Sequence, residues 1–326
     1  RQALELHPSL AVENKLINAL GTTRTLPALM LISTYLDNRA TAVQAAYAIK
    51  NILGKNTDLL GGSSVKQMLT KARQILRGEQ DADAGYAVDE IDGLLAKVAP
   101  EGFEPVAVTN ATGQKPFKST KTYENVEFYI DWKSADAAVL AVRSMPAVSL
   151  SPSEVVFLHG EGKAAAIPGE WNTLYVKVLN DRLFVKSNGK TVVENAVLKN
   201  TPDTKPIRTE GLIEFATGKG GEAELRNLYI RELPATPVFT LSDEEKKAGY
   251  VVLFDGRSLE NWQGNLTAYV PEDGNIYVSA NYGGSGNLYT KKKYSDFIYR
   301  FEFCFAVEGV NNGIGIRTNI GSDAAY

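Results

Sequence analysis

The sequence has few of the residues that enzymes most often use for metal binding and nucleophilic catalysis. It contains one cysteine, Cys304, and two histidines, His7 and His159. A single cysteine cannot form an internal disulfide, and two distant histidines give no Cys/His cluster with zinc-ligand spacing. No metal ligands are predicted, and His159 is expected to be a surface residue. Any catalysis should therefore depend on carboxylate, Arg, Lys or Tyr side chains.

The sequence also lacks an excess of charge of one sign and long apolar runs. Its 35 Lys and Arg residues are offset by 38 Asp and Glu residues, and no basic stretch is interleaved with aromatic residues. Nucleic acid is therefore not an expected partner. No run of about 18 apolar residues is present, so no membrane-spanning helix is expected.

The first residue is Arg1 rather than Met, and it lies in what reads as a helix without a signal segment before it. We therefore expect the chain to be a fragment or a processed product. No cofactor motif is evident, although the composition leaves open a bound metal ion such as calcium.

The N-terminal part has the periodicity of amphipathic helices. Apolar residues recur at steps of three and four between residues 10 and 98, with breaks at glycine and Asp-Asn positions. Helices are expected at residues 10–20, 26–37, 40–53, 63–77 and 84–97. The pair at 25–36 and 40–53 resembles a HEAT-type repeat, and a small helical bundle is the alternative. Either arrangement could hold a protein partner.

Beyond residues 100–102 the apolar period changes from 3.6 to 2. Strands are expected at 127–132, 174–178, 183–186, 191–193, 212–216, 225–232 and 250–254. Short strands separated by turns, without intervening helices, indicate an antiparallel β-sandwich. The expected fold is multidomain: a helical segment at 1–99, a first sandwich at 103–233 (the first β-region), and the N-terminal half of a second sandwich at 241–326 (the second β-region).

The two β-regions contain an internal repeat. Residues 120–131 align without a gap with residues 291–302. In each copy a polar loop then leads to an apolar strand that ends in arginine, Arg143 in the first and Arg317 in the second. The spacing from Tyr123 to Arg143 is 20 residues and that from Tyr294 to Arg317 is 23, so only the loop length differs.

Residues 250–262, with the sequence YVVLFDGRSLENW, are followed by further motifs at 294–297, 302–303 and 311–317. In this order they resemble the opening half of the 3-keto-disaccharide hydrolase family. The first β-region resembles the same family at its back end, through residues 168–173, 188–190, 206–207 and 225–233. It lacks the LFDG opening and the polar and acidic residues that the family usually carries after Arg143, so it is interpreted as a degenerate copy.

This resemblance implies a concanavalin A-like or laminin G-like jelly roll, activity on oxidised glycosides, and a periplasmic or secreted location. Carbohydrate is the implied ligand. The predicted function is that of a hydrolase or lyase that cleaves 3-keto-glycosides at the second β-region. The alternative is a non-catalytic glycan-binding or scaffold protein, because jelly rolls serve both classes.

The candidate catalytic residues are Glu302 and Arg317. In an expected strand at 299–305 four aromatic residues point to one side, which is expected to be core, and Glu302 points to the other. Arg317 follows Gly313 and Gly315, which leave space for a sugar ring. Arg317 would bind substrate oxygens, and Glu302 would position it or exchange protons. The alternative is a Glu–Arg salt bridge on an exposed sheet face.

Three further residues, Trp262, Asn312 and Tyr289, are the candidate substrate-binding residues. Trp262 could stack on a sugar ring, although a tryptophan at this place is also a natural core residue. Strand propensity equally explains the tyrosine-rich stretch that contains Tyr289. Asp255-Gly256 is expected to form a turn, and Lys291–Lys293 a solvated edge.

Overall fold

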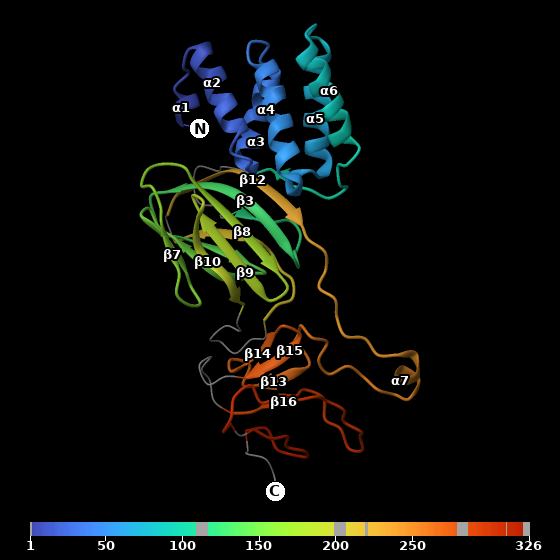
Figure 1. The fold of residues 1–326 in the computed structure, drawn as a ribbon. Coiled ribbons are helices and arrows are strands. Elements are labelled where there is room, and N and C mark those ends of the chain that lie inside the picture. Colours follow the sequence, from blue (N-terminus) through green and yellow to red (C-terminus); the bar gives the residue numbers. More distant parts are fainter. Residues whose placement is uncertain are drawn as a thin grey trace.

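The computed structural model describes residues 2–108, 117–198, 207–218, 221–278, 286–310 and 312–321. A helical segment, a β-sandwich and a C-terminal region follow one another along the molecule (Figure 1). The expected order of a helical segment followed by antiparallel β-structure is confirmed.

Six α-helices form the N-terminal segment: α1 (Gln2–Glu5), α2 (Leu10–Gly21), α3 (Leu26–Ser33), α4 (Ala42–Lys55), α5 (Gly62–Arg77) and α6 (Ala82–Leu95). Apolar side chains at helical spacing, such as Ile17, Ile49 and Leu69, are fully buried between them. The expected helix at 26–37 ends early, because its last turn tightens into a 3-10 helix at Thr34–Asp37. The resemblance to a HEAT repeat stays a prediction. Within the described residues, no helix has both the length and the apolar character needed to cross a membrane.

The first β-region is a sandwich of two six-stranded antiparallel sheets. One sheet has the order β1 (Glu104–Val106), β12 (Ala223–Glu232), β3 (Val126–Ser134), β8 (Asn172–Leu179), β9 (Arg182–Ser187) and β10 (Lys190–Val197). The other has the order β2 (Phe117–Lys118), β11 (Glu214–Thr217), β4 (Ala138–Val142), β5 (Met145–Leu150), β6 (Glu154–Phe157) and β7 (Lys163–Ala165). Alternate residues point between the sheets, where Phe128, Trp132 and Phe215 are almost completely buried.

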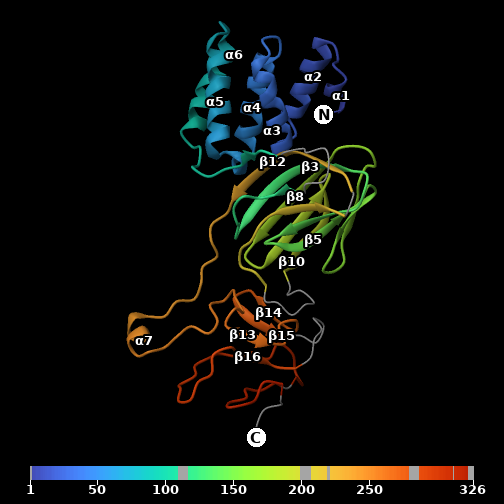
Figure 2. The ribbon, with the colours of Figure 1, turned by 180° about the vertical axis from the view of Figure 1, so that it is seen from behind.

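The helical segment packs on the outer face of the first of these sheets, which we call the helix-facing sheet (Figures 1 and 2). Tyr129 of β3 and Tyr229 of β12 contact the apolar core of the helices. Glu104 of β1 caps the N-terminus of α5: its Oε1 accepts the Ser63 N–H at 2.5 Å, and its Oε2 accepts the Ser64 hydroxyl at 2.6 Å. A carboxylate is favourable there because the first helical N–H groups lack partners within the helix.

Glycine permits a close backbone approach at the same junction. A Cβ atom on Gly102 would lie 2.0 Å from the carbonyl oxygen of Gly61, closer than any real contact. The two backbones therefore approach to a distance that only glycine allows.

The C-terminal region begins with α7 (Asp243–Lys247), which starts at a capping box between Ser242 and Glu245. Two two-stranded sheets follow, β13 (Trp262–Gly264) with β16 (Leu288–Thr290), and β14 (Tyr269–Glu272) with β15 (Asn275–Val278). A small core of Leu259, Trp262 and Leu266 lies between them.

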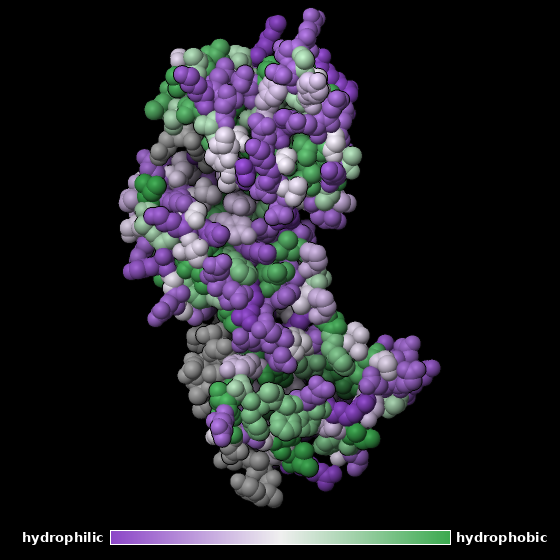
Figure 3. Space-filling view, viewed as in Figure 1, coloured by the Kyte–Doolittle hydropathy of each residue, from purple (hydrophilic) through white to green (hydrophobic). Residues whose placement is uncertain are grey.

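The strands expected at 250–254 and 299–305 are not formed, and neither is a strand at 313–317. Residues 299–305 are extended enough for their aromatic rings to follow one another at centroid distances of 4.8 to 6.1 Å. Among the described residues no strand pairs with this segment, so its aromatic face is not buried and the expectation that it forms core is wrong. Apolar surface is correspondingly visible on the C-terminal region (Figure 3).

Candidate functional site

The two candidate catalytic residues both lie in the irregular C-terminal segment. Glu302 is exposed and makes no hydrogen bond or ion pair with the residues that the structure describes. Arg317 is exposed, and its Nη2 donates to the backbone carbonyl of Ser295 at 3.3 Å. The structure therefore does not join Glu302 and Arg317 by any direct polar contact within the described ranges.

Of the candidate substrate-binding residues, Trp262 and Tyr289 lie on the paired strands β13 and β16, whereas Asn312 lies outside both strands. Trp262 is 9% exposed, packs in the small core and donates its indole N–H to the carbonyl of Leu253 at 2.8 Å. Tyr289 is half-buried in β16, and its hydroxyl accepts the N–H of Gly321 at 3.2 Å. Asn312 is exposed and accepts the N–H of Gly313. Core packing thus occupies Trp262, while Asn312 remains open to solvent.

The first β-region shows what the repeated arginine does in a complete sandwich. Arg143 and Ser144 form the two-residue turn between β4 and β5, with φ of 50° and 58°. The Arg143 side chain is buried, and its Nε donates to the carbonyl of Glu124 at 3.0 Å. Its Nη2 donates to the carbonyl of Asn180 at 2.6 Å and to Oδ1 of Asn125 at 3.3 Å. Arg143 therefore fixes two loops of the sandwich.

The same contact recurs in the second β-region. Ser295 aligns with Glu124 in the internal repeat. Arg317 binds the carbonyl of Ser295, as Arg143 binds that of Glu124, and Arg317 also has a positive φ, 56°. The two arginines thus share a backbone conformation and an acceptor position, which favours a role for Arg317 in holding a loop.

Asp131 is the counterpart of Glu302 in the repeat, and it is fully engaged. It is 2% exposed on the helix-facing sheet. Thr173 donates its hydroxyl and Asn227 its amide to the two carboxylate oxygens, each at 2.7 Å. The Arg226 guanidinium lies 3.6 Å from the same carboxylate. Both carboxylate oxygens of Asp131 are thus already bound by neighbouring side chains of the sheet.

A second carboxylate on this sheet, Glu127, is engaged beside the helical segment. Tyr175 donates its hydroxyl to Oε1 at 2.8 Å, and Arg231 donates two hydrogen bonds to Oε2. Burial, with the nearby Glu127 charge, raises the pKa of Tyr175. The same causes, burial first, raise the pKa of Tyr129 to about 12. These phenols stay neutral near pH 7. Since Tyr129 packs against the apolar core of the helices, this part of the sheet is a packed interface.

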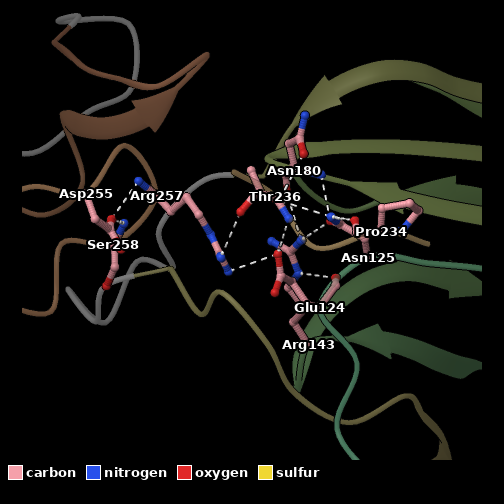
Figure 4. A network of polar contacts seen from close by, with 9 residues as sticks. All are labelled: Glu124, Asn125, Arg143, Asn180, Pro234, Thr236, Asp255, Arg257 and Ser258. Carbon is pink, nitrogen blue, oxygen red and sulfur yellow. Dashed lines mark hydrogen bonds and ion pairs between the residues drawn. The ribbon is translucent and has the colours of Figure 1, made fainter. Parts of the chain in front are cut away.

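A polar network that the sequence did not predict joins the first sandwich to the C-terminal region (Figure 4). Arg257 reaches across to Glu124, with its Nη2 3.2 Å from Oε1. Asp255 fixes the turn that holds Arg257, because its Oδ1 accepts the N–H groups of Arg257 and Ser258, each at 2.9 Å. The turn expected at Asp255-Gly256 is thereby confirmed, with Gly256 at a φ of 94°. Local sequence patterns predicted this turn, but they did not predict the contact of Arg257 with Glu124 across the junction.

A cavity of about 400 Å³ adjoins this network. It lies between the β8–β9 turn of the sandwich and the turns of the C-terminal region, and Phe239 and Arg208 are among the residues that line it. Nowhere in the described part of the chain do three or more His, Cys, Asp or Glu side chains gather as metal ligands.

Comparisons with solved structures find several β-sandwich proteins at low similarity. A proposed glycosyl hydrolase from Parabacteroides distasonis ATCC 8503 is 16% identical, with a TM-score of 0.29, over 37% of this chain and 77% of that chain. The carbohydrate binding module CBM66 from Bacillus subtilis is 12% identical, with a TM-score of 0.28, over 40% of this chain and 96% of that chain. Sheep galectin-11 is 13% identical, with a TM-score of 0.24, over 38% of this chain and 99% of that chain. No curated protein matches the chain.

A family model, described as the 3-keto-alpha-glucoside-1,2-lyase-like domain, matches residues 78–231 and 249–326. The match includes the sandwich and most of the C-terminal region, and thus both copies of the repeat. The protein belongs to the 3-keto-alpha-glucoside-1,2-lyase-like domain family.

Proposed function

We propose that the protein cleaves 3-keto-glycosides by proton abstraction and elimination, at a site in the second β-region that contains Glu302. The observation that carries this proposal is the contrast between two equivalent carboxylates. Asp131 is buried with its oxygens occupied, whereas Glu302 is exposed and has no polar partner in the described structure. Of the two, only Glu302 is available to accept a proton from a substrate.

The chemistry follows from the carbonyl group at C3 of the sugar. This carbonyl acidifies the C2–H bond, so a carboxylate can remove that proton and leave an enolate. When the enolate collapses, a C1–C2 double bond forms, the C1–O bond breaks, and the aglycone leaves with the glycosidic oxygen and takes up a proton. Addition of water across the new double bond completes a hydrolysis. This route differs from direct displacement, which uses a pair of carboxylates.

In this scheme Glu302 accepts the C2 proton, and Arg317 holds the loop that follows Tyr294. The geometry of Arg143 supports this role for Arg317. The alternative role, direct binding of substrate oxygens by the Arg317 guanidinium, is distinguished by Arg317→Lys. Lysine keeps the charge but cannot reproduce a forked contact. A variant with unchanged turnover supports the loop role, and a variant with normal stability and greatly reduced turnover supports direct binding.

The test is release of p-nitrophenol from a p-nitrophenyl 3-keto-glucoside by the whole chain. Glu302→Gln removes the base, and we expect it to lower kcat by about 100-fold or more, because a positioned general base contributes about 10² to 10⁴ in rate. Glu308→Gln is the matched control, since Glu308 is an exposed carboxylate of the same segment. Equal activity of both variants would contradict the role of Glu302.

The second candidate function is a non-catalytic glycan-binding or scaffold protein. It is favoured by the first sandwich, in which helices cover part of one sheet and both carboxylates are occupied. Glycan binding without turnover of any 3-keto-glycoside would establish this function instead.

We also propose a periplasmic or secreted location, which fractionation of the producing cells would test.

A further inference from the structure

The cavity between the sandwich and the C-terminal region has walls that are braced by ion pairs. Arg182 of β9 extends from the sandwich to Asp273 at 2.6 Å and to Glu272 at 3.3 Å. The Arg257–Glu124 pair forms a second bridge (Figure 4). The cavity, of about 400 Å³, is thus preformed and has the size of a small-molecule site at a domain junction.

The charges around this cavity are balanced. Three arginines and three aspartates line it: Arg143, Arg208, Arg257, Asp181, Asp255 and Asp273. Hydrogen-bond donors and acceptors are therefore both present. Two of these side chains can still form hydrogen bonds with a ligand. Within the described structure, Arg208 is exposed and makes no hydrogen bond, and Oδ2 of Asp255 accepts no hydrogen bond.

An aromatic ring completes the lining. Phe239 is 59% exposed, although its backbone N–H donates to the carbonyl of Asp255 at 2.9 Å and so holds the residue on the wall. An exposed phenylalanine fixed beside polar groups is suited to a ligand that is apolar on one face and polar at its edges.

We propose that this cavity binds a neutral mono- or disaccharide, as a carbohydrate site formed by residues other than Glu302. The C–H face of a pyranose packs on the Phe239 ring, and its hydroxyl groups donate to Asp255 and accept from Arg208 and Arg257. Because the three arginines and three aspartates balance, an anionic ligand gains no net attraction, and a purely apolar one would leave the charged groups without partners. A neutral polyol satisfies both kinds of group.

The test is isothermal titration of the whole chain with maltose and with cellobiose, which are neutral and carry no 3-keto group, so that no turnover is required. We expect Phe239→Ala to raise the Kd at least tenfold and Arg208→Ala to raise it several-fold. Tyr86→Ala, which removes an aromatic ring that is 72% exposed on the helical segment, should leave the Kd unchanged. Both cavity residues are exposed, so these substitutions should not unfold the protein.

Three results would overturn the proposal: neither disaccharide binds, Phe239→Ala binds as tightly as the unaltered chain, or glucuronate binds more tightly than maltose. Glu302→Gln separates this site from the proposed active site. Unchanged maltose binding by Glu302→Gln supports the cavity, and lost binding would place the sugar at Glu302 and refute it. Loss of turnover alone does not affect the outcome.

Discussion

Replacement of Arg143 tests how a buried cation holds the first sandwich together. Its guanidinium donates three hydrogen bonds to neutral oxygens, and such bonds from a charged group contribute about 1.5 to 3 kcal/mol each. Against this, burial, only partly offset by nearby charges, lowers the pKa of Arg143 to about 10, which corresponds to a net cost of about 3 kcal/mol for keeping the guanidinium charged. We therefore expect Arg143→Met to lower the free energy of unfolding by about 3 kcal/mol.

The measurement is urea unfolding followed by tryptophan fluorescence, because Trp132 and Trp171 both lie in the first β-region. Arg208→Met is the matched control: it makes the same chemical change at an exposed arginine of the same cavity, and a change within about 0.5 kcal/mol is expected. A loss of less than about 1 kcal/mol for Arg143→Met would refute the reasoning. It would mean that water from the cavity replaces the guanidinium at its acceptors.

Three further predictions concern the junctions and the small core. Burial raises the pKa of Glu104, but hydrogen bonds from Ser63 and Ser64 of α5 outweigh this effect and leave the pKa lowered. The stabilisation by the Glu104 carboxylate is therefore complete above about pH 4.3, the pKa in the unfolded chain, and is lost as the pH falls through the lower pKa of the folded protein. Glu104→Gln should therefore cost about 1 kcal/mol at pH 7 and nothing in strong acid, as measured by urea unfolding at several pH values. Gly102→Ala should cost about 1 to 3 kcal/mol through backbone overlap, whereas Gly93→Ala, in α6 with no atom near its Cβ, should stabilise by about 0.5 to 1 kcal/mol in thermal unfolding. Trp262→Ala should destabilise the C-terminal region by about 3 kcal/mol and increase its proteolysis, whereas a tryptophan that only binds sugar would leave proteolysis unchanged.

Local patterns in the sequence predicted the helices of the N-terminal segment and part of the β-structure, but not β1, β2, β5 to β7 or β13 to β16. The 3.6 period predicted the helices of the N-terminal segment, and the period of two predicted β3, β8, β9 and β12. Turn residues were equally informative, because their conformational preferences are local. Asp255 and Gly256 form the turn that their composition predicts, with Gly256 at a φ of 94°.

The sequence was less informative wherever a residue needs a distant partner. Alternation at 299–305 predicted a strand with a buried aromatic face, but a strand is stable only beside another strand, and within the described chain this segment has none. The same holds for the proposed site: Glu302 and Arg317 could be named from the repeat, but their mutual contact could not be inferred, and none is present among the described residues.

The sequence by itself determined that the chain has a helical segment, repeated β-regions and the motifs of one family, because each of these is encoded in neighbouring residues. Only the tertiary structure decided that Glu104 caps α5, that Asp131 is saturated by its neighbours, and that Arg257 meets Glu124 beside a cavity. The physical reason is that these contacts join residues far apart in the chain, and their geometry is set by the packing of whole elements rather than by local conformational preference.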